Sequence, residues 1–119
     1  MALETKIPEN QKDVTIVYLK GRMDVHYSSE VENELNKIID SGRKKLIISL
    51  EDVEYLSSSG LRVFIAITRK LQDVGGHLKL VKLNETTKKI FRIVELLDMF
   101  DIYENEEDAL KSFAWCCFN

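Results

Sequence analysis

Residues 51–67 read EDVEYLSSSGLRVFIAI, in which three consecutive serines and a glycine precede a strongly apolar segment. Leu61, Phe64 and Ile67 recur three residues apart there, which is the spacing of one face of a helix. A serine at the start of such a segment is typical of a helix N-cap, because its hydroxyl can accept a hydrogen bond from a free backbone N–H. The stretch predicts a helix that begins near Ser59, and one capping serine leaves the other hydroxyls to be explained.

Short apolar runs on both sides of this stretch predict strands. Val14–Leu19 and Leu46–Leu50 are apolar at almost every position, which is typical of strands that are buried on both faces. Leu78–Leu83 is predicted to be a third core strand, and Glu51–Leu56 to be a loop that leads into the serines. Two further strands are predicted near the ends of the chain, at Met1–Ile7, before a turn at Pro8–Lys12, and at Ile102-Tyr103.

Three more helices are predicted from caps and apolar spacing. Ser29 and Glu32 form a capping box that predicts the start of the first helix, which ends at Ser41-Gly42. Asn84 and Asn105 suit the N-caps of two later helices. The apolar residues expected on the buried faces of these helices are Val31, Leu35 and Ile38, then Ile90, Ile93, Val94 and Leu97, and finally Ala109, Leu110 and Phe113.

The order of these elements predicts an α/β fold. Strands alternate with helices along most of the chain, and each helix has one apolar stripe that must cover a face of the sheet. We therefore expect a mixed, mainly parallel central sheet of about four to five strands with about four helices. A chain of 119 residues, 45% of them hydrophobic, fits a single domain over residues 1–119.

The composition argues against several classes of function. The 17 basic and 20 acidic residues give a net charge of −3 without a basic stripe, so we expect no nucleic-acid partner. No run approaches the roughly 20 apolar residues of a membrane span, and the N-terminus is unlike a signal peptide, so we expect a cytoplasmic protein with no membrane partner. The adjacent Cys116 and Cys117 and the two histidines lack the spacing of a zinc site, and no metal or other cofactor is expected.

The serines are compatible with several functions. They follow a strand of the predicted parallel sheet, where partners usually bind, and the helix N-terminus after them favours a phosphate. A hydrolase is not expected, because no glycine stands two residues before any of the three serines. No spacing places His26 or His77 beside them, and both histidines are predicted to lie at the surface or at a strand end. A nucleotide-binding loop of the G-x-x-x-x-G-K-[ST] type is absent. Filler serines around a cap, and a site of modification or docking, are the remaining alternatives.

Three segments resemble the STAS domain family. VEYLSSSGLRVFIAITRKL (residues 53–71) is similar to the family's signature segment, in which serine, a small residue, glycine and leucine follow a strand. LKGRMDVHYSSEVENEL (residues 19–35) resembles the block before the family's first helix, and IFRIVELLDMFDIYENEEDAL (residues 90–110) resembles its C-terminal end. The resemblance covers about residues 12–112, and the order of elements predicted above is the order of that family.

The resemblance implies an anti-sigma factor antagonist of bacteria, which is a regulatory protein and not an enzyme. Such a protein binds an anti-sigma factor, often a serine kinase, and so releases a sigma factor. The kinase phosphorylates a serine at the start of the second helix and ends the binding, and a phosphatase reverses the modification. Matched position by position, the acceptor falls on Ser58, with Ser57 and Ser59 as alternatives because the three serines are adjacent. This sequence departs from the family at Ser57, where many members have aspartate. The residues expected to contact the partner are Asp24, Ser57, Ser58, Ser59, Gly60, Leu61, Arg62 and Val63.

Other uses of the same module stay open. A STAS domain can serve as a scaffold in a larger signalling assembly, where self-association matters more than competition with a sigma factor, and a weak homodimer is compatible with either use. A small-ligand or nucleotide-binding module is a third alternative, supported by the helix-end geometry alone. For Asp24, a local role in turning the chain competes with partner contact. For Val63, Ile65 and Ala66, cover by the protein's own fold competes with docking.

Overall fold

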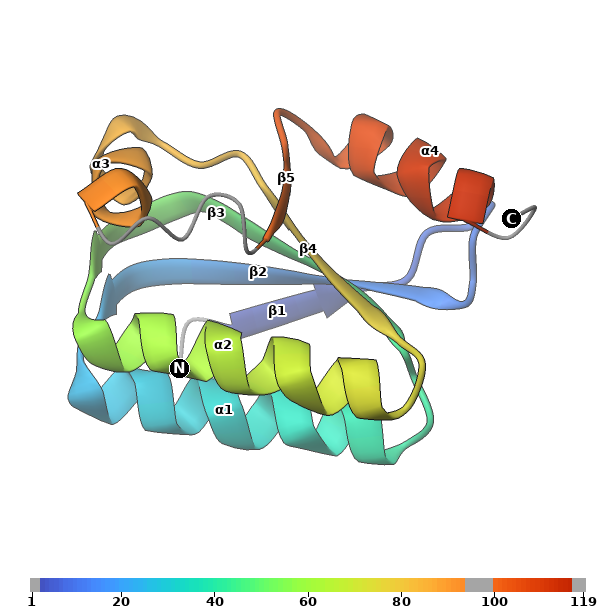
Figure 1. Cartoon of the computed structure of the whole chain (residues 1–119), viewed down its shortest axis with the longest axis horizontal. Coiled ribbons are helices and arrows are strands. Elements are labelled where there is room, and N and C mark those ends of the chain that lie inside the picture. The colour runs from blue at the N-terminus through green and yellow to red at the C-terminus, as the bar shows by residue number, and fades with distance from the viewer. Residues whose placement is uncertain (1–2, 94–99, 117–119) are drawn as a thin grey trace.

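A five-stranded sheet forms the centre of the protein (Figure 1). The computed structural model describes residues 3–93 and 100–116. The strands are β1 (Leu3–Lys6), β2 (Val14–Met23), β3 (Lys45–Leu56), β4 (His77–Val81) and β5 (Asp101–Tyr103), and they lie side by side in this order. β1 is antiparallel to β2, and the other three pairs are parallel. The prediction of a mixed, mainly parallel sheet is confirmed.

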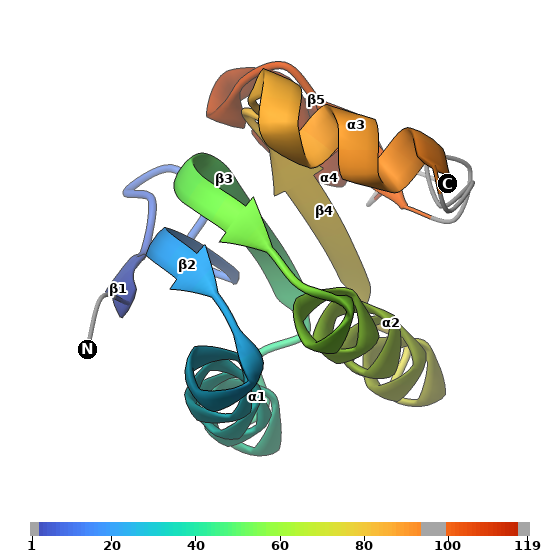
Figure 2. The same cartoon turned by 90° about the vertical axis from the view of Figure 1, so that its left-hand side faces the viewer.

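Helices cover both faces of the sheet (Figure 2). The described residues form four of them, α1 (Val25–Asp40), α2 (Ser58–Asp73), α3 (Glu85–Ile93) and α4 (Glu106–Cys116). α1 and α2 lie side by side on one face, whereas α4 lies on the other face and α3 packs against β3. This arrangement confirms the predicted α/β class and the predicted order of elements.

The sheet separates two hydrophobic clusters. Successive side chains of β3 belong to different clusters: Leu46, Ile48 and Leu50 join the larger one with the buried residues of α1 and α2, whereas Ile47 joins the smaller one with Phe113 of α4. Because both faces of β3 are covered, nearly every residue in its first half must be apolar. This burial explains why the strand is visible in the sequence as a continuous apolar run.

The first helix begins earlier than the sequence predicts. Asp24 is the N-cap of α1, and its Oδ1 accepts a hydrogen bond from the backbone N–H of Tyr27 at 2.9 Å. Ser29 lies exposed inside the helix, so the predicted capping box with Glu32 is wrong. The sequence hides this first turn because Val25 is 71% exposed and does not extend the apolar stripe.

The predicted loop over Glu51–Leu56 is also wrong, because these residues continue β3. They pair with the end of β2, where Met23 lies opposite Leu56. The register of the pair shifts before and after Gly21, whose φ is +92°, and such irregularities interrupt the two-residue period of a strand. β2 and β3 therefore both extend beyond the predicted strands, and they end together where α1 and α2 begin.

Two later helix caps agree with the sequence. The backbone N–H of Thr87 donates to Oδ1 of Asn84 at 3.0 Å, and the backbone N–H of Asp108 donates to Oδ1 of Asn105 at 2.8 Å. The predicted N-caps are therefore confirmed, because a short polar side chain binds the otherwise free N–H groups of the first turn. Of the apolar residues predicted for these helices, two lie outside the described residues, namely Val94 and Leu97.

β4 ends before Leu83, where the sequence predicts its last residue. The chain turns at Lys82, whose φ of 57° lies in the left-handed region.

The Lys82 ammonium forms ion pairs with Glu51 at 3.3 Å and with Glu106 of α4 at 3.4 Å, and hydrogen bonds to these two carboxylates raise the pKa of Lys82. Burial and the hydrogen bond that it donates to Glu106 raise the pKa of Tyr18 to about 12. These contacts fasten α4 to the sheet.

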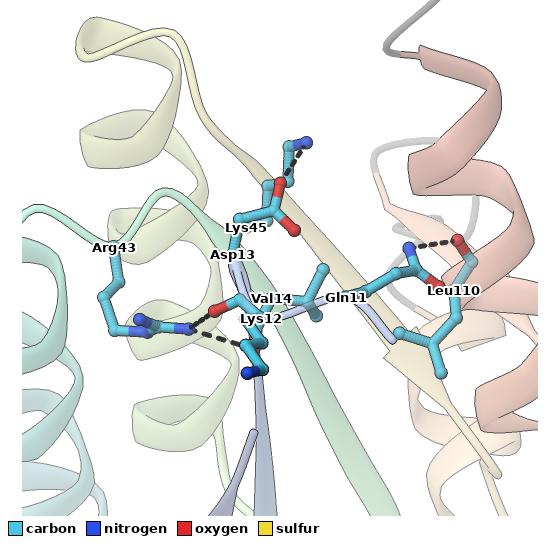
Figure 3. Close-up of polar contacts among 7 residues, drawn as sticks. All are labelled: Gln11, Lys12, Asp13, Val14, Arg43, Lys45 and Leu110. Atoms are coloured by element: carbon cyan, nitrogen blue, oxygen red, sulfur yellow. Dashed lines mark hydrogen bonds and ion pairs between the residues drawn. The ribbon is translucent and has the colours of Figure 1, made fainter. Parts of the chain in front are cut away.

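Polar contacts also fasten the turn between β1 and β2, at the amino ends of the parallel strands (Figure 3). Gln11 Nε2 donates to a backbone carbonyl of α4 at 2.8 Å. Arg43 donates to the carbonyl of Lys12 at 2.6 Å. Lys45 forms an ion pair with Asp13 at 2.7 Å, and its hydrogen bond lowers the pKa of the Asp13 carboxyl. We call Gln11, Asp13, Arg43 and Lys45 the amino-end clamp.

Candidate functional site

Two helices begin next to each other at the carboxyl ends of β2 and β3 (Figure 2). Met23 and Leu56, the last residues of these strands, are paired in the sheet. The free N–H groups and the positive dipole ends of α1 and α2 therefore lie at the same edge of the molecule. We call this region, formed by Asp24 and the three serines Ser57–Ser59, the serine end.

Ser57 is part of the scaffold of the serine end. Its Oγ accepts a hydrogen bond from the backbone N–H of Gly60 at 3.2 Å, which makes it the N-cap of α2. Its backbone N–H donates to the carbonyl of Met23 at 3.0 Å, and its hydroxyl donates to the same carbonyl. Ser57 thus ties the start of α2 to the end of β2, and its hydroxyl is fully used.

Ser58 presents the most accessible hydroxyl of the three serines. It is the first residue of α2 and is exposed, whereas Ser59 is half-buried. Within the described residues the Ser58 side chain has no hydrogen-bond partner. A phosphate at this position would meet free N–H groups and the positive end of the helix dipole. The geometry allows a modification of Ser58 that leaves the cap made by Ser57 in place.

Gly60 brings the first turn of α2 close to the ends of the two strands. A Cβ atom at this position would lie 2.6 Å from Cδ1 of Leu56 and 3.2 Å from Cβ of Met23. Contacts this short would force the neighbouring side chains to move. Gly60 therefore permits a close approach that no other residue allows, and it has a structural role beside the serines.

Two of the residues predicted to contact a partner are buried in the larger hydrophobic cluster. Leu61 is 7% exposed and Val63 is 5% exposed, so of the two alternatives for Val63 the structure favours cover by the protein's own fold over docking. The reason is that α2 is covered both by the sheet and by α1, so its buried face is wider than one apolar stripe. Ile65 and Ala66 are half-buried, and Arg62 is exposed. Direct contact with a partner stays a prediction for Arg62. Leu61 and Val63 pack in the core beneath the first turns of α2.

Asp24 has the local role that its position in a turn suggested. Its carboxylate caps α1 through Tyr27 and is exposed to solvent. Because the carbonyl of Met23, the residue before Asp24, accepts both hydrogen bonds from Ser57, the caps of α1 and α2 lie next to each other. Contact of Asp24 with a partner stays a prediction, and the structure places the residue beside the serines where such contact would occur.

Three exposed residues that the sequence did not single out flank the serines. The guanidinium carbon of Arg22 lies 4.6 Å from the centre of the Tyr55 ring, in a cation–π contact across β2 and β3. Tyr55 is 39% exposed, and Val25 is one of the most exposed apolar residues among those described. Tyr55 escaped notice because residues 51–56 were expected to form a loop, and Val25 because the helix was expected to begin after it.

Neither histidine forms a catalytic pair with a serine. His26 lies in the first turn of α1, with a side chain that is 92% exposed and 3.7 Å from Glu30. His77 is the exposed first residue of β4, at the amino end of that strand. Both occupy the surface and strand-end positions predicted for them, and no hydrogen bond joins either one to a serine within residues 3–93 and 100–116.

A cleft of about 590 Å³ lies between the β1–β2 turn and α4, lined in part by Pro8, Ile16 and Leu110. It is at the opposite end of the strands from the serines, so it offers no support for a nucleotide held by the helix N-termini of the serine end.

Among the described residues, no three His, Cys, Asp or Glu side chains are grouped to hold a metal ion. No helix in that part of the chain is long and apolar enough to cross a membrane.

Comparison with known proteins agrees with this geometry. A family model described as the STAS domain matches residues 5–109. The anti-sigma-B factor antagonist of Bacillus subtilis is 31% identical to the chain over 111 residues, which are 93% of this chain and 100% of that protein. The residues matched by the family model include both the serine end and the amino-end clamp.

Two solved structures of SpoIIAA show a similar fold. The unphosphorylated form of this anti-sigma factor antagonist has a TM-score of 0.74 at 20% identity, and the alignment covers 95% of this chain and 98% of that one. The phosphorylated form of SpoIIAA, described as a Bacillus cell fate determinant, has a TM-score of 0.69 at 21% identity, with 92% and 99% covered. At such low identities these likenesses concern the fold alone.

Proposed function

The chain belongs to the STAS domain family, and on that premise we propose that it acts as an anti-sigma factor antagonist. The observation that carries the proposal is the exposed hydroxyl of Ser58 at the N-terminus of α2, on a scaffold that the Ser57 cap holds in place. The anti-sigma-B factor antagonist of Bacillus subtilis, which aligns along its whole length, supports the same function. In this function the chain binds an anti-sigma factor and so releases a sigma factor.

The proposed docking surface is the serine end together with the exposed residues around it. Tyr55 and Val25 supply apolar area, and Arg22 lies over the Tyr55 ring. Aromatic side chains and arginine often contribute most to the affinity of an interface. Asp24 and Arg62 add exposed charges of opposite sign, which favours a partner surface with complementary charges.

Phosphorylation of Ser58 by the anti-sigma factor, acting as a serine kinase, would end the binding. A phosphate adds about −1.5 to −2 charges at neutral pH. At a helix N-terminus this charge is favourable by roughly 0.3 to 1 kcal/mol, so the domain stays folded. In the interface the same charge costs several kcal/mol where it meets a like charge or loses its water. A phosphatase would restore the binding.

Ser58 is a better acceptor than its two neighbours. The hydroxyl of Ser57 is engaged with Met23 and Gly60, so a phosphate there would break the cap of α2. Ser59 is half-buried. Only Ser58 combines exposure with a free hydroxyl, and this supports its assignment as the modified residue.

Binding of an anti-sigma factor kinase from the same cell tests the proposal. We expect Ser58→Ala to bind as tightly as the wild type and to stay bound when ATP is added. We expect Ser58→Asp to bind at least about tenfold more weakly, which corresponds to roughly 1.4 kcal/mol. Isothermal titration calorimetry measures both affinities, and mass spectrometry after incubation with ATP identifies the modified serine.

Thr86→Asp is a control for added charge, because Thr86 is exposed in the first turn of α3 and is not part of the proposed docking surface. It adds the same charge near a helix N-terminus and is expected to leave the affinity unchanged. Equal affinities of Ser58→Asp and wild type would contradict the electrostatic switch, and phosphate found on another residue would contradict the assignment of Ser58.

The proposed function requires no catalysis by the chain itself. The kinase supplies the phosphoryl transfer, and this chain supplies the hydroxyl and the surface around it. A protein that competes for an anti-sigma factor acts where sigma factors act, which places it in the cytoplasm. A radiolabelled ATP assay with the purified chain alone is expected to show neither hydrolysis nor self-phosphorylation.

A further inference from the structure

β1 is an edge strand, and no other strand of the described residues pairs with its outer side. It pairs with β2 on its inner side, from Leu3 opposite Leu19 to Lys6 opposite Ile16. Figure 2 shows β1 at the margin of the sheet, with its outer side away from the four described helices. The backbone groups that point away from β2 are therefore available to another strand, as at any open sheet edge.

The edge is held in an extended form before any partner arrives. The amino-end clamp fixes the turn that follows β1 (Figure 3). Gln11 donates a hydrogen bond to a backbone carbonyl of α4, Arg43 donates one to the carbonyl of Lys12, and Asp13 forms an ion pair with Lys45. An edge that is already ordered loses less conformational entropy when a second strand pairs with it.

The sequence of this edge is complementary to itself. Residues 3–7 read Leu-Glu-Thr-Lys-Ile. In an antiparallel pair of two such segments centred on Thr5, Glu4 lies opposite Lys6 of the second copy, and Lys6 lies opposite its Glu4. Leu3 lies opposite Ile7 of the second copy. Opposite charges and apolar pairs directly across two strands stabilise the pairing, and like charges oppose it.

The side chains needed for this pairing are free in the single chain. Glu4 and Lys6 are exposed, and within the described residues neither forms an ion pair. Ile7 is 51% exposed. Charges on an edge strand usually discourage pairing, but the order of Glu4 and Lys6 makes one antiparallel register attractive.

From this complementarity we propose that a second copy of the chain binds along β1, so that the two sheets join into one across a two-fold axis. The interface is isologous, because the same segment contributes to both sides. It is short, which makes the dimer weak and dependent on concentration. The paired residues of β2 are 16–19, short of its carboxyl end, so the serine end of each copy stays open. The proposal therefore does not rest on the function proposed above.

Charge exchange at Glu4 and Lys6 tests the proposal. Sedimentation equilibrium up to about 1 mM protein covers the range of weak association. We expect a monomer–dimer equilibrium for the wild type, and a dissociation constant at least about tenfold higher for Glu4→Lys alone or for Lys6→Glu alone, because each places like charges opposite each other twice. The double variant Glu4→Lys with Lys6→Glu restores the opposite charges and is expected to dimerise like the wild type.

Mixing the two single variants gives the sharpest result. In a mixed pair the Glu4→Lys chain presents two lysines to the two glutamates of the Lys6→Glu chain. The equimolar mixture is therefore expected to form a heterodimer at concentrations at which each variant alone is mainly monomeric. Glu9→Lys and Lys12→Glu carry the same charge changes in the neighbouring exposed turn and are expected to dimerise like the wild type. A wild type that stays monomeric, single variants that dimerise normally, or a mixture that does not associate would each overturn the proposal.

Discussion

At the amino ends of β2 and β3, long polar side chains bind the backbone and each other. At the carboxyl ends, short polar side chains cap two helices, and Ser58 and Arg62 are exposed beside them. Arg43 and Gln11 of the amino-end clamp donate to main-chain carbonyls. At the serine end, the short side chains of Asp24 and Ser57 satisfy the backbone as helix caps. Ser58, beside them, has no hydrogen-bond partner among the described residues.

The difference shows how one sheet can be stable at one end and available for binding at the other. Backbone groups must be hydrogen-bonded at both ends. At the serine end, each helix cap binds a backbone N–H with one short side chain. The residues next to the caps are therefore not needed for this purpose and can contact a partner. In the clamp, the longer side chains of Gln11 and Arg43 donate to backbone carbonyls for the same purpose.

The largest expected effect concerns Gly60, which lets the first turn of α2 pack closely against Met23 and Leu56. Gly60→Val places a branched side chain where even a Cβ would be 2.6 Å from Leu56. We expect a loss of about 2 to 3 kcal/mol in the free energy of unfolding, measured by urea denaturation. Ser58→Val, two residues away on the exposed side, is expected to change it by less than about 0.5 kcal/mol. Equal effects of the two substitutions would remove the distinction between scaffold and free surface.

A smaller effect is expected when the amino-end clamp loses its arginine. Arg43→Met keeps most of the side-chain volume but leaves the carbonyls of Lys12 and Val14 without this donor. We expect a loss of about 1 to 3 kcal/mol in the free energy of unfolding. Arg62→Met at the serine end is the matched control, since Arg62 is exposed and forms no ion pair within the described residues. A loss of stability as large for Arg62→Met as for Arg43→Met would contradict the comparison of the two ends.

The smallest expected effect is a dependence of stability on pH at the clamp. The hydrogen bond from Lys45 lowers the pKa of Asp13 in the folded protein, so the ion pair stabilises the fold above the unfolded pKa and loses this effect as the pH falls through the folded pKa. Asp13 is more than half exposed, so the contribution at neutral pH is below about 1 kcal/mol. Thermal unfolding of the wild type and Asp13→Asn should differ near pH 7 and converge in acid. A difference that grows on acidification would have the wrong sign.

Much of the fold follows from local patterns in the sequence. Continuous apolar runs marked the core parts of β2, β3 and β4, because strands covered on both faces leave few positions for polar residues. Asn84 and Asn105 were identifiable as caps, since a cap bonds to an N–H only a few residues away. The same locality makes the serines recognisable as the start of a helix.

The errors in the sequence prediction share a physical cause. The second half of β3 depends on pairing with β2, and a bulge near Gly21 hides its alternation. Val63 is buried because α1 packs beside α2, which a single helical stripe does not show. In both cases, residues distant in the sequence decide whether a side chain is exposed.

By itself, the sequence determined the α/β class, the order of elements and the position of the serines at the start of a helix, because these depend on periodicity and capping over a few residues. Tertiary structure alone decided that Ser57 caps the helix while Ser58 stays free, and that Asp24, Arg22 and Tyr55 lie beside them. The physical reason is the register of β2 against β3, which pairs Met23 with Leu56 across a long stretch of sequence and so sets which hydroxyl bonds to the scaffold and which remains exposed.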